Sequence, residues 1–524
     1  PRGGRHGLGI VRGELDIAPG DWFLACHFID DRVMPGTLMY ECGLHAMRVL
    51  LLRLGWIAER GAAAFEPVPG VRSRLKCRGQ VLESTRTLAC EVVLKEIGDR
   101  PAPFAIADAL LFADGKPIVE VTDMSLRLSG VEREDLERVW REKGRAAERS
   151  PPEAGPGRKP AVFGNEKILA FAVGKPSEAF GEPYRVFDEE RVIARLPGPP
   201  YKFLDRITAV RAAPWILESG GEVEAQYDVP PDAWYLGESG CGSAAARMPF
   251  AVLLEVALQP CGWLAAYAGS ALTSPVDLRF RNLGGEGVQL RAVTPASETL
   301  TTAVKLTSVS SASGMIIEHY DLDVRDVHGP VYRGKTYFGF FSVEALSRQV
   351  GIRDAGLHRL TPEEETSSGR FAFPEGAPFP GAMLRMVDRI TEYVPNGGPR
   401  GLGFVRGEAA VNPSAWFFAA HFFQDPVWPG SLGLESHLQL LEAAAARRWG
   451  TAPGVHFESM VPGAKHSWVY RGQVVPADHT VTVEAVITEA DDARRILVAD
   501  GFLSVDGRVI YQMKGFALRL HSKE

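Results

Sequence analysis

A histidine and a glutamate recur at one fixed spacing near both ends of the sequence. Glu41 follows His27 after fourteen residues, and Glu435 follows His421 after the same interval. A neutral histidine is suited to accept a proton near pH 7, and a carboxyl group held among apolar neighbours can stay protonated and donate one. The repeated pair therefore predicts general acid–base chemistry at two places in the chain.

The surroundings of the pair repeat as well. The segment HFIDDRVMPG begins at His27 and the segment HFFQDPVWPG begins at His421, so Gly36 and Gly430 both stand nine residues after the histidine. A single histidine is more often an ordinary core residue than a catalytic one. Agreement over about thirty-five positions favours a functional role and indicates two copies of one unit.

A third, weaker copy lies between them, in the segment DAWYLGESGCGSAAARMPFAVLLEVALQ. It keeps a carboxylate, Glu255, at the same distance from its proline, but Phe250 replaces the glycine. The histidine position falls on Ser239 or on Cys241, depending on the side from which the motif is counted. We interpret this as the loss of a functional group and not as the gain of a cysteine nucleophile.

These repeats divide the chain into three units. We place the units at residues 1–130, 183–345 and 376–524, and we expect linkers over residues 131–182 and 346–375. An LDRIT or VDRIT segment stands some thirty residues ahead of the second and third motifs. The first copy lacks this segment, so we expect its opening element to be missing.

Each copy has the same predicted order of elements. A helical run follows the Pro-Gly pair, and the run over residues 38–56 is apolar almost all round, which indicates a helix buried on most sides. Strand-like alternation closes each copy at residues 116–128, 329–341 and 507–520. The order predicts an α+β fold in which an antiparallel sheet wraps around a central helix.

Composition excludes several other classes of protein. The net charge of −7 comes without a basic stripe, so we expect no nucleic-acid partner. The most apolar helical run carries Glu41, His45, Arg48 and Arg53, which is too much charge for a membrane span. The six cysteines have no CxxC spacing and indicate reduced thiols in a cytoplasmic protein.

The two complete motifs, each with its carboxylate fourteen residues after the histidine, resemble the hot-dog-fold 3-hydroxyacyl-acyl carrier protein (ACP) dehydratases. The likeness is greatest to the β-hydroxydecanoyl-ACP dehydratase type. Several copies in one chain, one of them degenerate, resemble the dehydratase region of bacterial polyunsaturated fatty acid synthases. The resemblance implies hot-dog units paired as double hot-dogs. The implied reaction is dehydration of 3-hydroxyacyl-ACP to 2-enoyl-ACP. Isomerisation of the double bond stays open, because the isomerising enzymes carry Asp where this chain has Glu.

The resemblance also implies a role for each repeated group. The histidines His27 and His421 would remove a proton from C2 of the substrate. The candidate groups that protonate the departing hydroxyl are Glu41, Glu255 and Glu435. Free N–H groups at Gly36 or Gly430, at the positive end of a helix, would stabilise charge on the thioester carbonyl. Supporting positions are the histidine-orienting carbonyls of Val33 and Val427 and the glutamines Gln259 and Gln439.

The implied partners follow from this chemistry. The substrate would be carried on the phosphopantetheine of an ACP within a multidomain synthase, with no metal and no redox cofactor. A hot-dog site combines the histidine of one unit with the carboxylate of its partner, so Glu255 would complete a site with His421 or with His27. The shorter linker favours the former, and the first unit would then need a partner outside this chain, for example in a homodimer. The alternatives are an acyl-ACP thioesterase and a non-catalytic acyl-binding scaffold.

Overall fold

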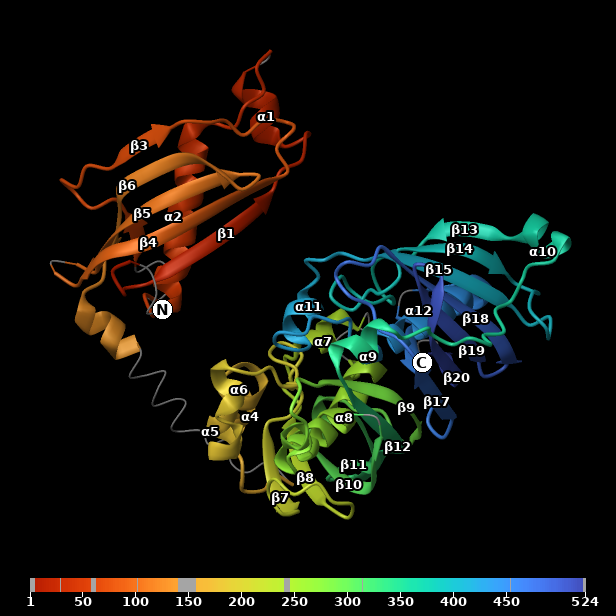
Figure 1. The fold of residues 1–524 in the computed structure, drawn as a ribbon. Helices are drawn as coiled ribbons and strands as arrows, with labels where there is room; N and C mark the ends of the chain where they lie inside the picture. Colours follow the sequence, from red (N-terminus) through yellow and green to blue (C-terminus); the bar gives the residue numbers. More distant parts are fainter. Residues whose placement is uncertain are drawn as a thin grey trace. The chain divides into compact units, whose positions relative to one another are not determined.

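The computed structural model describes residues 5–28, 30–57, 63–100, 102–139, 157–239, 246–312, 314–452 and 454–521. The chain forms two compact units, Pro1–Glu153 and Ala154–Glu524 (Figure 1). Each unit is described by itself.

The N-terminal unit is one antiparallel sheet curved around one helix (Figure 1). The strand order is β1 (Ile10–Asp16), β4 (Thr87–Gly98), β5 (Phe104–Ala113), β6 (Lys116–Ser129) and β2 (Ala64–Glu66), and β3 (Arg74–Cys77) also pairs with β6. The helix α2 (Gly36–Arg53) buries Met39, Met47 and Leu51 against the sheet. This is the predicted arrangement of a sheet around a helix, but the prediction that this helix is buried on most sides is wrong, because Val49 and Leu52 on its other face are exposed.

The larger unit holds a single fourteen-stranded antiparallel sheet. Its order is β13 (Gly369–Ala372), β14 (Arg389–Val394), β15 (Phe404–Ala410), β18 (Thr480–Asp491), β19 (Ile496–Val505), β20 (Arg508–His521), β17 (Lys465–Tyr470), β9 (Arg279–Gln289), β12 (Gly329–Phe341), β11 (Met315–Asp326), β10 (Thr299–Ala312), β8 (Glu222–Asp228) and β7 (Arg206–Arg211), with β16 (His456–Ser459) on β20. The pairing of β9 with β17 joins the middle copy to the last copy. The two copies therefore form one double hot-dog, which is the pairing favoured by the shorter linker.

Two central helices fill this double hot-dog. They are α8 (Phe250–Tyr267) in the middle copy and α12 (Gly430–Trp449) in the last copy, and they contact each other. Both begin directly after a proline, where the fixed backbone of proline suits a helix start. Nearly every residue of α8 is buried, which explains its uniform apolar character.

The helix α8 is also the one described helix with the length and hydropathy to cross a membrane. Within the structure, 89% of this segment is buried, as expected for the central helix of a folded core.

A short helix that carries the repeated tryptophan recurs in each copy. These helices are α1 (Trp22–His27), α7 (Trp234–Glu238) and α11 (Trp416–Ala420). Three further elements, η1 (Glu182–Tyr184), η3 (Ser270–Thr273) and η4 (Pro295–Ser297), are single turns.

The stretch expected to be a linker over residues 131–182 contains two core helices. These are α4 (Asn165–Val173) and α5 (Pro176–Phe180), followed by α6 (Val186–Glu189). Ile168, Phe171 and Phe180 are buried in the core of the larger unit. The linker prediction followed the Pro- and Gly-rich composition of residues 150–160, but the apolar segment after them packs into the core of the larger unit. The middle copy therefore begins earlier than residue 183.

The second expected linker, over residues 346–375, is also partly structured. It contains α10 (Pro362–Ser367), which a Thr361 capping box starts, and the edge strand β13. The helix α9 (Val343–Ser347) precedes it. Because β13 pairs with β14, the sheet of the last copy begins before residue 376.

Candidate active site

His421 lies directly after α11, in the loop that leads into α12. It is 8% exposed, and its Nδ1 lies 3.0 Å from the carbonyl oxygen of Val427. Donation from Nδ1–H to this carbonyl leaves the lone pair on Nε2 available as a base. Burial lowers the pKa of His421 to about 3, so the ring is neutral near pH 7.

Glu255 reaches the same place from the other copy. It lies on α8, and its carboxyl accepts hydrogen bonds from Ser431 Oγ at 2.7 Å and from Gln259 Nε2 at 3.0 Å. Ser431 is the second residue of α12, so the side chain of one helix is held at the start of the other. Burial raises the pKa of Glu255, which favours the protonated acid.

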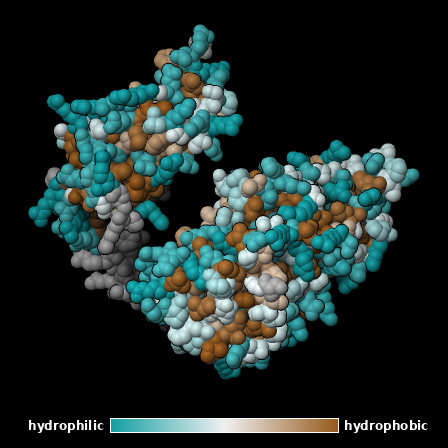
Figure 2. Space-filling view, viewed as in Figure 1, coloured by the Kyte–Doolittle hydropathy of each residue, from teal (hydrophilic) through white to brown (hydrophobic). Residues whose placement is uncertain are grey.

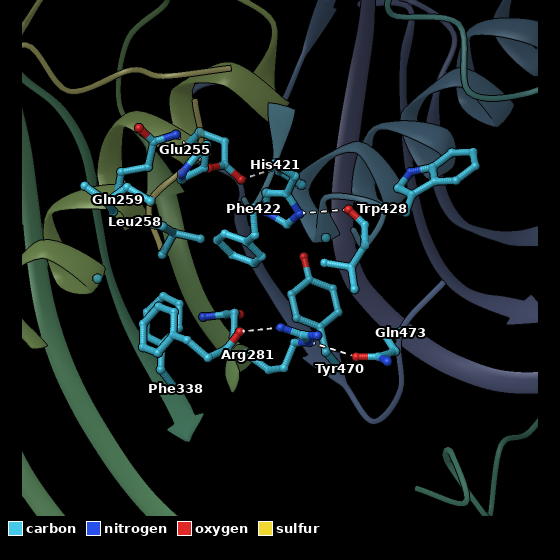
Figure 3. A pocket seen from close by; sticks show the side chains of 18 of the residues that line it. Glu255, Leu258, Gln259, Arg281, Phe338, His421, Phe422, Trp428, Tyr470 and Gln473 are labelled. Atoms are coloured by element: carbon cyan, nitrogen blue, oxygen red, sulfur yellow. Dashed lines mark hydrogen bonds between the residues drawn. The ribbon is translucent and has the colours of Figure 1, made fainter. Parts of the chain in front are cut away.

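Glu255 and His421 line one pocket (Figure 3). The pocket holds about 720 Å³ of space free of protein atoms, part of it open to solvent. Gly430, Ser431 and Val427 also line it. The site therefore combines the base of the last copy with the carboxyl of the middle copy.

One end of this pocket is apolar. Leu258 and Gly262 of α8 face it together with Leu196, Phe280 and Phe338. A Cβ atom added to Gly262 would lie 3.2 Å from Leu196 and 3.4 Å from Phe280. The absence of a side chain at position 262 thus lets Leu196 and Phe280 pack close to α8 in this part of the pocket.

An ion pair between the two copies holds the histidine loop. Arg281 of β9 donates to both carboxylate oxygens of Asp425, at 2.6 and 3.0 Å, and its Nε donates to Gln473 at 2.8 Å (Figure 3). Asp425 lies four residues after His421. A two-point contact of this kind fixes orientation as well as position.

A second half-site lies at the opposite end of the helix pair. Glu435 of α12 accepts a hydrogen bond from Ala251 N at the start of α8, at 3.3 Å. Burial raises its pKa to about 7. Phe250 stands at the start of α8, where the half-site with His421 has Gly430 at the start of α12. Ser239 Oγ donates to the carbonyl of Leu236, and Cys241 lies outside the described residues.

The two glutamines show that the halves are related by the repeat. Gln259 Nε2 donates to the carbonyl of Tyr201, and Gln439 Nε2 donates to the carbonyl of Leu384. Gln439 therefore supports the second half-site in the way that Gln259 supports the first. The residues that supply these carbonyls differ in their side chains. The hydroxyl of Tyr201 lies 2.8 Å from Ser431 Oγ, whereas Leu384 has no hydroxyl.

The N-terminal unit has the same loop but an open surrounding. His27 Nδ1 lies 2.7 Å from the carbonyl of Val33, and α2 begins at Gly36. Glu41 is 38% exposed at its side chain and is paired with Arg48 at 2.6 Å and with His45 at 3.3 Å. The unit thus presents a histidine and a carboxylate without a second helix start beside them.

The residue seven positions after each glutamate distinguishes the three copies. It is Arg48 in the first, Gly262 in the second and Glu442 in the third. Arg48 forms an ion pair with Glu41, and Glu442 is a buried carboxyl whose pKa burial and Glu435 both raise. Of the three glutamates, Glu255 is the one with neither a cation nor a second carboxyl at this position.

Three residues of the site were not predicted from the sequence. Ser431 follows Gly430 as Thr37 follows Gly36 in the first copy, so a repeated hydroxyl was available as a signal. Tyr201 becomes visible only when the LDRIT and VDRIT segments are aligned, because Leu384 occupies its place in the last copy. Arg281 lies in a strand without any motif and gave no signal.

Comparison with known proteins finds similarity to one domain family and to one synthase subunit. Residues 1–122 and 379–514 match the model of the FabA-like domain. Over its full length the chain is 28% identical to one of the subunits of a polyunsaturated fatty acid synthase from Thraustochytrium sp. (strain ATCC 26185 / S-3), and it spans 44% of that protein. The parts of the chain that match this model are in the N-terminal hot-dog unit and the last hot-dog copy.

Solved structures with a related arrangement are more distant. An oleoyl thioesterase (putative) from Lactobacillus plantarum is 11% identical with a TM-score of 0.35, over 58% of this chain and 98% of that one. The dehydratase domain from the CurJ module of curacin polyketide synthase is 13% identical with a TM-score of 0.33, over 60% of this chain and 96% of that one. Among the described residues, no group of three or more His, Cys, Asp or Glu side chains is arranged to hold a metal ion.

Proposed function

We propose that the double hot-dog dehydrates 3-hydroxyacyl thioesters at the site formed by His421 and Glu255. The observation that carries this proposal is the shared pocket in which a neutral histidine faces a buried carboxyl with a raised pKa. A base and an acid whose pKa values are displaced in these directions suit the removal of one proton and the delivery of another near pH 7.

The reaction balances with these two groups. His421 Nε2 takes the proton from C2 of the substrate, and the C2–H electron pair forms the C2=C3 double bond. The C3–O bond breaks, Glu255 protonates the departing hydroxyl, and water leaves. The proton on His421 then returns to Glu255 through solvent. The N–H of Gly430, at the start of α12, stabilises the negative charge that builds on the thioester carbonyl.

The carrier and setting of the substrate are part of the proposal. The similarity to a subunit of a polyunsaturated fatty acid synthase supports a thioester on the phosphopantetheine of an ACP, within a cytoplasmic multidomain synthase. The apolar end of the pocket around Gly262 supports an acyl chain that extends beyond C4. The chemistry needs no metal and no redox cofactor.

We further propose that the N-terminal unit pairs with a hot-dog unit of another molecule. In the larger unit Trp416 packs against Trp234 with ring centroids 5.3 Å apart, across the two copies. The equivalent Trp22 is 68% exposed. Strand β17 pairs with β9, whereas the equivalent β3 pairs within its own unit with β6 alone. A second copy of this chain would cover these groups and bring a second helix start to Glu41.

The roles of the two buried glutamates provide the test. Glu255→Gln and Glu435→Gln are matched variants, since each removes a buried carboxyl beside the start of the other helix. With a 3-hydroxyacyl-pantetheine substrate, we expect Glu255→Gln to lower kcat about 100-fold or more and Glu435→Gln to leave it within about twofold. Equal losses in both variants would refute the assignment. Release of free acid by the wild type would identify a thioesterase, and tight binding without turnover would identify a scaffold.

A further inference from the structure

The hydroxyl of Tyr470 is buried without a hydrogen-bond partner among the described residues. Tyr470 ends strand β17 and is 5% exposed. A buried hydroxyl without a partner costs about 1–3 kcal/mol relative to a satisfied one. Such a group in a folded protein calls for an explanation, and a ligand that supplies the missing partner is one.

The location of this hydroxyl points to the reacting part of the substrate. Tyr470 lines the same pocket as Glu255 and His421, and Figure 3 shows its hydroxyl end directed toward His421 and Phe422 and away from Arg281. A Cβ atom added to Gly430 would lie 3.0 Å from the hydroxyl oxygen. The hydroxyl is therefore beside the start of α12, where the N–H of Gly430 has no partner within the helix.

The ring of Tyr470 is held in place by its neighbours. It packs edge-on against Tyr511 with centroids 4.4 Å apart, and Gly430 lies against its face. Burial raises the pKa of Tyr470 well above its ordinary value, so the hydroxyl remains protonated and able to donate. A rigid, neutral, buried donor is suited to stabilise developing negative charge.

The first copy differs at this position. Tyr470 and Cys77 both stand directly before an Arg-Gly-Gln segment. A Cβ atom added to Gly36 would meet Cys77 Sγ at 3.5 Å, so the thiol occupies the place of the phenol ring. A thiol is a weak donor, and the strong donor is thus specific to the site that also contains Glu255.

We propose that the Tyr470 hydroxyl and the Gly430 N–H together bind the carbonyl oxygen of the substrate thioester. This inference rests on the proposed dehydration and adds a substrate-binding residue to it. As His421 removes the C2 proton, negative charge moves onto that oxygen, and both hydrogen bonds become stronger. Glu255, which Ser431 and Gln259 hold, remains free to serve the C3 hydroxyl.

Tyr470→Phe tests the proposal because it removes one oxygen atom that has no partner among the described residues. We expect kcat/KM for a 3-hydroxyacyl-pantetheine thioester to fall about 10- to 100-fold, and the melting temperature to stay equal or rise. The control is Tyr332→Phe, which removes a buried hydroxyl that contacts His466 at 3.0 Å. This control should lower stability and leave kcat/KM within about twofold. Unchanged turnover in Tyr470→Phe would overturn the proposal.

A pair of ligands separates carbonyl binding from a general packing effect. The probes are a 2-enoyl-pantetheine thioester and the matching thioether, in which a methylene replaces the carbonyl. Tyr470→Phe should weaken binding of the thioester about 5- to 10-fold and leave thioether binding unchanged. Equal weakening of both ligands would show a packing role and overturn the inference. A wild type that shows this difference between ligands but no dehydration would refute the proposed function and leave the carbonyl contact standing.

Discussion

Three glutamates of the same type, at the same point of three repeated helices, lie in different electrostatic surroundings. Glu41 is paired with Arg48, Glu435 has the buried carboxyl of Glu442 near it, and Glu255 is held by the neutral donors Ser431 and Gln259. A general acid must carry a proton at working pH, which an arginine partner opposes and burial among neutral groups favours. At the residue scale, Glu255 is therefore the carboxyl best placed to act as the acid.

The pH dependence of turnover follows from the buried histidine. Because burial lowers the pKa of His421 to about 3, the base stays unprotonated far below the usual range of histidine. We expect kcat/KM to keep most of its pH 7 value at pH 5, as measured by initial rates in short assays. An acidic limb centred near pH 6.5 would contradict this account. The free energy of unfolding should fall as the pH drops below about 6.5, because His421 then binds a proton in the unfolded chain and does not bind one in the folded protein.

The carboxyl of the second half-site gives the opposite dependence for stability. Folded Glu435 has a pKa of about 7, whereas the unfolded residue titrates near 4.5. Between these values the unfolded chain has released a proton that the folded protein retains, so stability decreases as the pH rises. Glu435→Gln should therefore stabilise the larger unit at pH 8 by about 1–3 kcal/mol and have little effect at pH 4. Urea unfolding at both pH values measures this, and equal effects at both would refute it.

The central helices and their starts could be predicted at the element scale. The Pro-Gly pairs at 35–36 and 429–430 place the starts of α2 and α12, and the sheet follows from the alternating strands. The linker predictions failed where polar composition adjoins an apolar helix, as at α4. Tyr201 and Arg281 were missed because their roles depend on contacts with residues 230 and 144 positions away, at Ser431 and Asp425.

We expect Gly262 of α8 to limit the depth of the proposed acyl pocket. A leucine at this position would project toward Leu196 and Phe280. Gly262→Leu should lower kcat/KM for a ten-carbon substrate more than about 10-fold and affect a four-carbon substrate less than about threefold. The equivalent change in the other half, Glu442→Leu, is the matched control and should not alter chain-length preference. Equal losses for both substrates in Gly262→Leu would show that the apolar end of the pocket does not hold the chain.

At the scale of the whole molecule, the middle and last copies form one hot-dog pair, and the described residues of the N-terminal unit form a single hot-dog copy. In the larger unit, the residues and strands equivalent to Trp22 and β3 form the contacts between the two copies. In the N-terminal unit, Trp22 is exposed, and β3 pairs with β6 among the described strands. In Figure 2 apolar side chains also reach the visible face of the N-terminal unit, in the region where Figure 1 draws α2 and the neighbouring strands. These features support the proposed association of this unit with a second copy of the chain.

Association through this unit is measurable in solution. Light scattering after gel filtration should give about twice the chain mass of 57.1 kDa for the wild type and 57.1 kDa for Trp22→Glu. Val162→Glu, which changes an exposed apolar residue of the larger unit, should remain a dimer. A monomeric wild type at micromolar concentration would contradict the proposed pairing. Turnover at His421 should be the same in all three proteins.

Mass spectrometry of a 3-hydroxyacyl-ACP incubated with the protein tests the central claim most directly. Dehydration lowers the mass of the acyl group by one water, about 18 daltons, and the comparison is between the wild type, His421→Ala and His27→Ala. We predict that the wild type and His27→Ala produce this loss and that His421→Ala does not. A loss that persists in His421→Ala and disappears in His27→Ala would contradict the assignment of the site to the double hot-dog.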